Sequence, residues 1–237
     1  MHFPIAETTV MSIGGSLLVP EGGPSQTFLK GLNEFVRAQV ARGRRFILVV
    51  GGGRTARQYI DAAKSIHEID PEDLDWLGIH ATRLNGHLLR TVFRDLAYSV
   101  VVKNPKRTPK RQRKSIIVAA GWKPGWSTDY VAARIAHRVG ATHLINMSNI
   151  DQVYDADPRE VPGANPLSDM NWKEYRKMVG NEWSPGLSAP FDPIASKFCH
   201  KKHIEVFVVG NDFDNVERLL DGREFQGTRL HGKEISL

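Results

Sequence analysis

The sequence has only one cysteine, Cys199, among its 237 residues. A single cysteine excludes an internal disulfide and a multi-cysteine zinc site. No run approaches the roughly eighteen apolar residues that a membrane-spanning helix needs. The opening MHFPIAETTV also lacks the basic and apolar regions of a secretory signal. We therefore expect a cytoplasmic protein that does not contact a membrane.

Internal repeats and low-complexity linkers are missing as well. The hydrophobic fraction of 41% and the charged fraction of 24% are ordinary for a globular protein. A chain of this length is long enough to bury a sizeable core. We expect one folding unit with two lobes that meet near residues 121–128.

Apolar runs typical of strands alternate with amphipathic patterns typical of helices. The expected strands are residues 8–13, 46–50, 99–103, 115–119, 142–147 and 204–209. The expected helices are residues 27–42, 55–65, 73–97, 128–139 and 215–220. This alternation predicts an α/β fold with a mostly parallel sheet and helices on both faces.

Glycine or small polar residues follow several of these strands: Gly14-Gly15-Ser16, Gly51-Gly52-Gly53, Gly121, and Ser148-Asn149. Ligands of such sheets bind at the carboxyl ends of the strands, so these turns predict a cleft. Glycine lets backbone N–H groups approach a phosphate closely. Neither Gly14-Gly15 nor Gly51-Gly52-Gly53 matches a P-loop or a G-x-G-x-x-G fingerprint. Glycine turns of this kind also occur for purely geometric reasons.

The stretch GWKPGWSTDYVAARIA, residues 121–136, combines two tryptophans with a glycine- and proline-rich turn. It then enters the expected helix through Ser127 and Thr128. A tryptophan in such a turn stacks on the base of a bound nucleotide, or it packs in the core or against a neighbouring subunit. The residues alone leave both interpretations open.

Two further residues are candidates for the chemistry. Lys197 lies in an expected short helix within FDPIASKFC, residues 191–199, which Asp192 caps and Pro193 starts. The alternative for Lys197 is a solvated surface position. Asp151 follows a strand and is placed to orient a lysine or a metal, or it is a turn acid bonded to backbone.

Residues 103–114 carry seven basic side chains and no acid: Lys103, Lys106, Arg107, Lys110, Arg111, Arg113 and Lys114. One interpretation is a solvated connection between two strands, and the other is a contact for a polyanion. No aromatic residue interleaves with these charges in the sequence, as a platform for single-stranded nucleic acid requires. Nucleic-acid binding is therefore not expected.

Six motifs in order resemble the amino acid kinase family, most closely its archaeal-type UMP kinases. They are IGGSLLVP (13–20), VVGGGRTARQYI (49–60), DWLGIHATRLNGHLL (75–89), GWKPGWSTDYVAA (121–133), NIDQVYDADP (149–158) and DPIASK (192–197). The resemblance implies a three-layer sandwich with a mostly parallel sheet of about eight strands. It also implies an acceptor lobe of about residues 1–135 and an ATP lobe of about residues 136–237.

The resemblance further implies roles for individual residues. Those expected at ATP are Gly14, Gly15, Gly53, Arg57, Ser148, Tyr154 and Asp157. Those expected at the acceptor are Gly52, Asp75, Gly121, Trp122, Lys123, Pro124, Gly125, Trp126, Ser127 and Thr128. Lys197, Asp151 and Arg57 are the expected catalytic residues, and no protein ligand of a metal is assigned.

The implied reaction transfers the γ-phosphoryl group of Mg-ATP to UMP and gives UDP. A phosphate oxygen is already charged near neutral pH, so alignment and charge neutralisation suffice without a dedicated base. The family also implies a homo-oligomer, a hexamer built of dimers. The alternatives are a kinase of the same fold for another small phosphate or carboxylate, such as isopentenyl phosphate, and a non-catalytic nucleotide binder.

This chain departs from the family pattern at three places. Ser12 stands where many members carry a lysine, two residues before the first glycine. The acceptor loop has Trp122, Lys123 and Trp126 in place of small residues, threonine and histidine. Gln152 stands where glycine is common. These departures bear on the identity of the acceptor more than on the chemistry.

Overall fold

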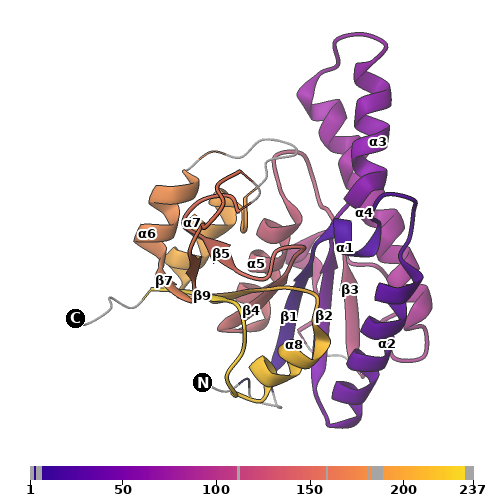
Figure 1. The fold of residues 1–237 in the computed structure, drawn as a ribbon. Coiled ribbons are helices and arrows are strands. Elements are labelled where there is room, and N and C mark those ends of the chain that lie inside the picture. The colour runs from indigo at the N-terminus through magenta and orange to yellow at the C-terminus, as the bar shows by residue number, and fades with distance from the viewer. Residues whose placement is uncertain are drawn as a thin grey trace.

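A computed structural model describes residues 3, 7–110, 113–158, 160–180, 182 and 189–232. Its centre is a sheet of seven strands in the order β3-β2-β1-β4-β8-β9-β7 (Figure 1). The strands are β1 (Thr8–Ile13), β2 (Arg45–Val50), β3 (Ile116–Ala119), β4 (His143–Met147), β7 (Asp169–Asn171), β8 (Glu205–Val209) and β9 (Thr228–His231). All neighbours pair in parallel except β8 and β9. The predicted α/β fold with a mostly parallel sheet is confirmed.

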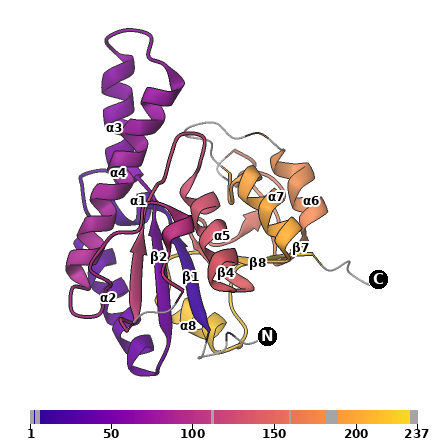
Figure 2. The ribbon, with the colours of Figure 1, turned by 180° about the vertical axis from the view of Figure 1, so that it is seen from behind.

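Helices cover both faces of this sheet. The helices α1 (Gly15–Leu18), α2 (Gln26–Ala41), α4 (Pro71–Val92) and α8 (Phe213–Leu220) pack on one face, and α5 (Thr128–Val139), α6 (Trp172–Val179) and α7 (Pro193–Lys202) pack on the other (Figure 2). Phe46, Leu48 and Val50 of β2 point into the first layer, while Ile47 and Val49 point into the second. A strand apolar on both sides is thus buried between two helix layers, which makes a three-layer sandwich.

One predicted strand is wrong. Residues 99–103 do not form the predicted strand and make only one isolated bridge, between Val102 and Ala119. Proline has no N–H for a ladder, and Pro105 opens the 3-10 turn η1 (Pro105–Arg107) directly afterwards. The chain adds elements that were not predicted, namely β7, β9, α6 and a small hairpin of β5 (Val153–Tyr154) and β6 (Pro166–Leu167).

The long predicted helix over 73–97 is α4, which runs from Pro71 to Val92 behind an Asp70 cap. Its first half pairs with α3 (Gly53–Lys64), and the two project from the body of the molecule (Figure 1). The predicted cap at Asp192 and start at Pro193 of α7 are confirmed. Across the described ranges, no helix is both long and apolar enough to cross a bilayer.

Arg44 is a charged residue in the core, with 1% of its surface exposed. Its guanidinium donates to the carbonyls of Phe3 at 2.9 Å and Leu220 at 2.8 Å, and it lies 3.2 Å from the Asp221 carboxylate. A buried charge survives only when its donors are satisfied. Arg44 therefore ties the N-terminal segment and the end of α8 to the start of β2.

Replacing Arg44 by alanine should lower the free energy of unfolding by about 3–5 kcal/mol, because the buried carbonyls lose their donors and a cavity opens. Arg42→Ala is the matched control. Arg42 pairs with the same Asp221, but its side chain is 41% exposed, so the loss should stay below about 1 kcal/mol. Urea unfolding of both variants measures the difference. Equal losses would contradict a structural role specific to Arg44.

Candidate functional site

The tips of β1 and β2 bring the two glycine turns into contact. Ile13 pairs with Val50 in the parallel register, so both strands end at the same level. Gly15 then packs directly on the backbone of residues 51–53, where a Cβ would overlap main-chain atoms. Gly53 has φ of +63°, a conformation that favours glycine. The turns predicted from the sequence thus form one rim.

Polar side chains on the inner face of α4 fix the neighbouring loops. The Asn85 amide donates to the carbonyls of Gly51 at 2.8 Å and Gly52 at 3.1 Å. The Thr82 hydroxyl accepts from the Gly121 N–H at 2.8 Å. Arg83 donates to the Trp122 carbonyl at 2.9 Å. One helix therefore positions loops from two strand ends around a common space.

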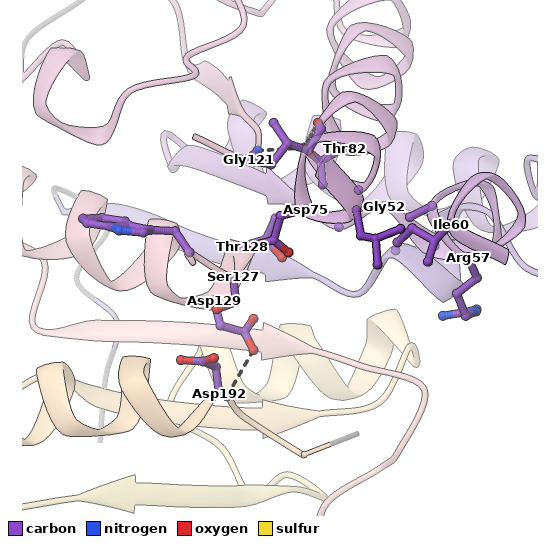
Figure 3. Close-up of a pocket in the computed structure, with 18 of the residues that line it drawn as sticks. Gly52, Arg57, Ile60, Asp75, Thr82, Gly121, Ser127, Thr128, Asp129 and Asp192 are labelled. Carbon is purple, nitrogen blue, oxygen red and sulfur yellow. Dashed lines mark hydrogen bonds between the residues drawn. The ribbon is translucent and has the colours of Figure 1, made fainter. Parts of the chain in front are cut away.

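That space is a cavity of about 340 Å³, called here the glycine cavity (Figure 3). Of the predicted site residues, Gly15, Gly52, Gly53, Arg57, Asp75, Gly121, Trp126, Ser127 and Thr128 line it. Their positions span 113 residues of sequence, and the fold brings them together. Ile60, Leu74 and Ile79 supply an apolar side between α3 and α4.

Asp75 holds the tip of the loop formed by residues 121–128. Its carboxylate accepts the Gly125 N–H at 2.7 Å. Burial raises the pKa of Asp75, the Gly125 N–H opposes this, and the nearby charge of Glu72 adds to the rise. Asp75 and the loop therefore close one side of the glycine cavity together, and Asp75 lies close to Thr128 there (Figure 3).

The two tryptophans of the loop pack mainly on the protein. Trp122 and Trp126 meet edge to face with ring centroids 4.6 Å apart, and both lie against the core beneath α5. Trp126 continues onto Tyr130 at 4.3 Å and still lines the glycine cavity. Trp122 does not line it. Trp122 therefore packs on the protein and is not placed to stack on a base in the cavity. Trp126 both packs on the core and lines the cavity.

Asp129 and Asp192 form a carboxylate pair on the floor of the glycine cavity (Figure 3). Asp129 accepts from the Ser12 hydroxyl at 2.8 Å and from the Asp192 N–H at 3.3 Å. Burial raises the pKa of Asp129 against these hydrogen bonds. Burial, with help from the charge of Asp129, raises the pKa of Asp192 to about 6. The Asp192 Oδ2 atom is buried without a hydrogen-bond partner.

A second cavity of about 380 Å³ lies beside the first and is called here the tyrosine cavity. Ser148, Tyr154 and Asp157, all predicted at ATP, line it. Ile150, Met178 and Val179 make its apolar wall, the last two from α6. Ala189 lines both cavities, so they adjoin. A flat apolar group with polar edges fits the tyrosine cavity, and phosphates fit the glycine cavity.

Several predicted site residues line neither cavity. They are Gly14, Trp122, Lys123, Pro124, Gly125, Asp151 and Lys197. Gly14 donates its N–H to the Met147 carbonyl at 2.8 Å and so joins β1 to β4. Asp151 lies against the backbone of Gly210 at the end of β8. The Lys197 side chain is exposed on α7, the helix that Asp192 caps.

The sequence interpretation missed Asp129, Thr82 and Asn85. Asp129 follows Thr128 within the motif GWKPGWSTDYVAA. An acidic residue in the first turn of α5 was therefore visible in the sequence. Asp192 was assigned only as a helix cap. Thr82 and Asn85 carried no signal, because threonine and asparagine inside a helix are usually solvated or bonded locally.

Comparison with known proteins agrees with this geometry. A model of the amino acid kinase family matches residues 7–210. A uridylate kinase of Thermococcus sibiricus is 35% identical over 207 residues, which cover 86% of this chain and 90% of that protein. A uridylate kinase of Methanospirillum hungatei is 37% identical over 224 residues, covering 93% of each chain.

Solved structures agree with the fold. The crystal structure of a uridylate kinase from Archaeoglobus fulgidus superposes with a TM-score of 0.80 at 28% identity, covering 94% of this chain and 99% of that one. An aspartate kinase from Synechocystis superposes with a TM-score of 0.72 at 15% identity, covering 98% of this chain and 40% of that one, and shows the fold alone. With a family model over most of its length and relatives above 30% identity, the chain belongs to the amino acid kinase family.

Proposed function

We propose that this protein is a UMP kinase, which transfers the γ-phosphoryl group of ATP to UMP and yields ADP and UDP. The observation that carries the proposal is the pair of adjoining cavities, one lined by glycine turns and one by Tyr154 and apolar side chains. Two phosphorylated molecules bound there would meet near Ala189. The uridylate kinases among the relatives support UMP as the acceptor.

The acceptor would occupy the glycine cavity between α4 and the loop 121–128. Thr128 and Ser127 stand at the start of α5, where unpaired N–H groups and the helix dipole favour a phosphate. Gly52 and Gly53 face it from the other side, with Arg57 on α3. Asp75 has one oxygen beyond its Gly125 contact for the ribose hydroxyls. The segment up to about residue 135 then serves as the acceptor lobe.

ATP would place its adenosine in the tyrosine cavity and its phosphates toward Gly15. Tyr154 offers a ring for the base, and Ser148 and Asp157 offer polar groups for the base and the sugar. All residues that line this cavity lie between 148 and 190, within the C-terminal lobe proposed from about residue 136. Gly15 supplies its N–H at the junction.

Charge neutralisation is the main chemical task, since a UMP phosphate oxygen is already a nucleophile. Arg57 lines the glycine cavity from α3. Lys197 stands on α7, and its long flexible side chain would have to swing toward the cavity when phosphates bind. The missing lysine at Ser12 makes these two cations more important. Asp129 and Asp192 orient the groups around them, a role first assigned to Asp151.

The carboxylate pair fits a magnesium ion. Asp192 Oδ2 is buried without a hydrogen-bond partner, Asp129 lies beside it, and carboxylate oxygens are preferred ligands of Mg²⁺. The structure shows no cluster of three or more metal-binding side chains among its described residues. Mg²⁺ would therefore bind through this pair and the phosphates, where it neutralises phosphate charge.

Self-association is part of the proposal. No residue of α3 is buried. Tyr59 on α3 is 62% exposed, Ile66 in the connection between α3 and α4 is 78% exposed, and Leu84 in the second half of α4 is 62% exposed. Large apolar side chains on a projecting helix pair favour contact with a second copy. A hexamer, the state that the family resemblance implies, would cover this α3–α4 projection.

A cytoplasmic location remains a prediction.

The direct test is an assay of nucleotide products with ATP and a panel of acceptors. UMP should give UDP with a kcat/KM at least about 100-fold above that for isopentenyl phosphate, because Asp75 is placed for a ribose. Turnover of another acceptor in preference to UMP would favour the alternative kinase. Tight ATP binding without any product would favour a non-catalytic binder.

Asp75→Asn should raise the KM for UMP about tenfold or more and leave the KM for ATP unchanged. Asparagine keeps an acceptor for the Gly125 N–H but loses the charged hydrogen bond to the ribose. Asp73→Asn makes the same change at an exposed acid of the same helix and should change neither constant. An equal rise in both KM values for Asp75→Asn would mean that Asp75 is misplaced.

Asp192 should make stability depend on pH. Its pKa of about 6 in the folded protein exceeds its ordinary value of 3.8. The folded state therefore binds the proton more tightly, and the stabilisation present at pH 4 is lost as the pH rises through 6.

Relative to Asp192→Asn, the free energy of unfolding of the wild type should fall by about 2 kcal/mol between pH 4 and pH 7. Asparagine still caps α7. Asp212→Asn makes the same change at the exposed cap of α8 and is measured alongside as the control for the loss of a capping charge. Urea unfolding across this pH range measures both, and parallel curves for wild type and Asp192→Asn would refute the assignment.

A further inference from the structure

A third cavity lies on the outer side of α5, away from the proposed nucleotide sites. This basic cleft has a volume of about 290 Å³ and is lined by Pro105, Lys106, Lys110, Arg134, His137 and Arg138. It shares no lining residue with the glycine cavity or the tyrosine cavity. Apart from Pro105, every lining side chain is basic, and no acid lines the cleft.

Several arginines elsewhere on the molecule are paired with acids. Arg37 binds Asp95 at 2.8 Å, and Arg229 binds Glu205 at 2.9 Å. In the described part of the chain, by contrast, no salt bridge joins an acid to any of the four cations of the cleft. Like charges gathered in one hollow repel one another, and a bound anion would relieve that repulsion.

Neutral groups hold the two arginines of the cleft in place. Arg138 Nε donates to the Thr108 carbonyl at 2.8 Å. The Arg134 guanidinium lies 5.3 Å from the ring centre of Trp126 and 5.0 Å from that of Phe198. Ring faces and a carbonyl orient the side chains while leaving their positive charge uncompensated. The cleft is therefore arranged in advance for an anion.

The surroundings of His137 agree with a positive potential at this place. Burial lowers the pKa of His137, and the charges of Lys202 and Arg134 lower it further. Lys202 comes from the end of α7, which packs beside α5 (Figure 2). The cations that line the cleft thus come from two segments, η1 with the residues after it and α5, and Lys202 of α7 adds positive charge beside His137.

We propose that the basic cleft binds a compact oligophosphate, either inorganic triphosphate or the triphosphate of a nucleotide. Arginine and lysine in a concave cluster suit several phosphate oxygens at once. A single nucleic-acid strand would instead need open ring faces along a groove. The nearby rings of Trp122, Trp126, Tyr130 and Phe198 are partly buried and pack on one another and on the cations.

An anion bound in the cleft would affect the glycine cavity through Trp126. Its ring contacts Arg134, a lining residue of the cleft, and it also lines the glycine cavity. A phosphate that draws Arg134 toward the cleft would loosen that contact. This regulatory consequence rests on the proposed function, whereas oligophosphate binding itself does not.

The test is calorimetric titration of inorganic triphosphate into the full chain and two double variants. Lys106→Gln/Lys110→Gln removes two cations of the cleft that line no other cavity. Lys30→Gln/Lys64→Gln removes the same charge from exposed positions on α2 and α3. The cleft variant should bind at least about tenfold more weakly, and the control should stay within about twofold of wild type. ATP and UTP, titrated alongside, distinguish a nucleotide from free triphosphate as the tighter ligand.

Turnover of UMP, measured with ATP and no added inorganic triphosphate, separates this inference from the proposed function. Both double variants should still convert UMP to UDP, because none of the four lysines lines a proposed nucleotide cavity. Cleft-dependent triphosphate binding by a protein that lacks turnover would support the cleft and reject the kinase. An equal loss of triphosphate affinity in both double variants would mean that only the net charge of the protein matters, and would overturn the inference. Binding of oligonucleotides alone, tighter with each added nucleotide, would overturn it in favour of a nucleic-acid surface.

Discussion

The close approach of the two glycine turns at the tips of β1 and β2 determines where the chemistry can occur. Gly15 rests on the backbone of residues 51–53, and any side chain at Gly15 would push the turns apart. Asn85 ties the second turn to α4 from behind. With the turns in contact, Arg57 on one side and Asp129 on the other face a single cavity. The adjoining tyrosine cavity then opens at the same edge of the sheet.

The electrostatics of this edge depend on Ser12, whose neutral hydroxyl, and not a cation, faces the Asp129 carboxylate. The Asp129 carboxylate accepts from the Ser12 hydroxyl and the Asp192 N–H, and the Asp192 carboxylate accepts from the Ala195 N–H. Neither forms a salt bridge to a basic side chain within the described residues. Burial consequently raises both pKa values. A cation that arrives with the nucleotides would restore the balance, so ligand binding and charge compensation are coupled.

The sequence sufficed for the fold because strands buried on both faces, such as Phe46 to Val50, are recognisable as continuous apolar runs. It also located the glycine turns and the loop at Gly121. The sequence predicted a strand over residues 99–103 that does not form, because Pro105 ends the pairing. It also gave no prediction of β7 and β9, which are short. Thr82 and Asn85 could not be predicted as site residues, since their importance depends on which loops α4 meets.

Arg111, one of the seven basic residues of the segment 103–114, lies outside the residues that the structure describes.

The central idea is that UMP and ATP lie end to end across Ala189. A crystal structure of the protein with UMP, Mg²⁺ and a non-hydrolysable ATP analogue examines it directly. We expect the UMP phosphate beside Gly52 and Thr128, its ribose at Asp75, adenosine against Tyr154, and the γ-phosphate between the two near Gly15. A nucleotide bound outside these cavities, or phosphates that face apart, would contradict it.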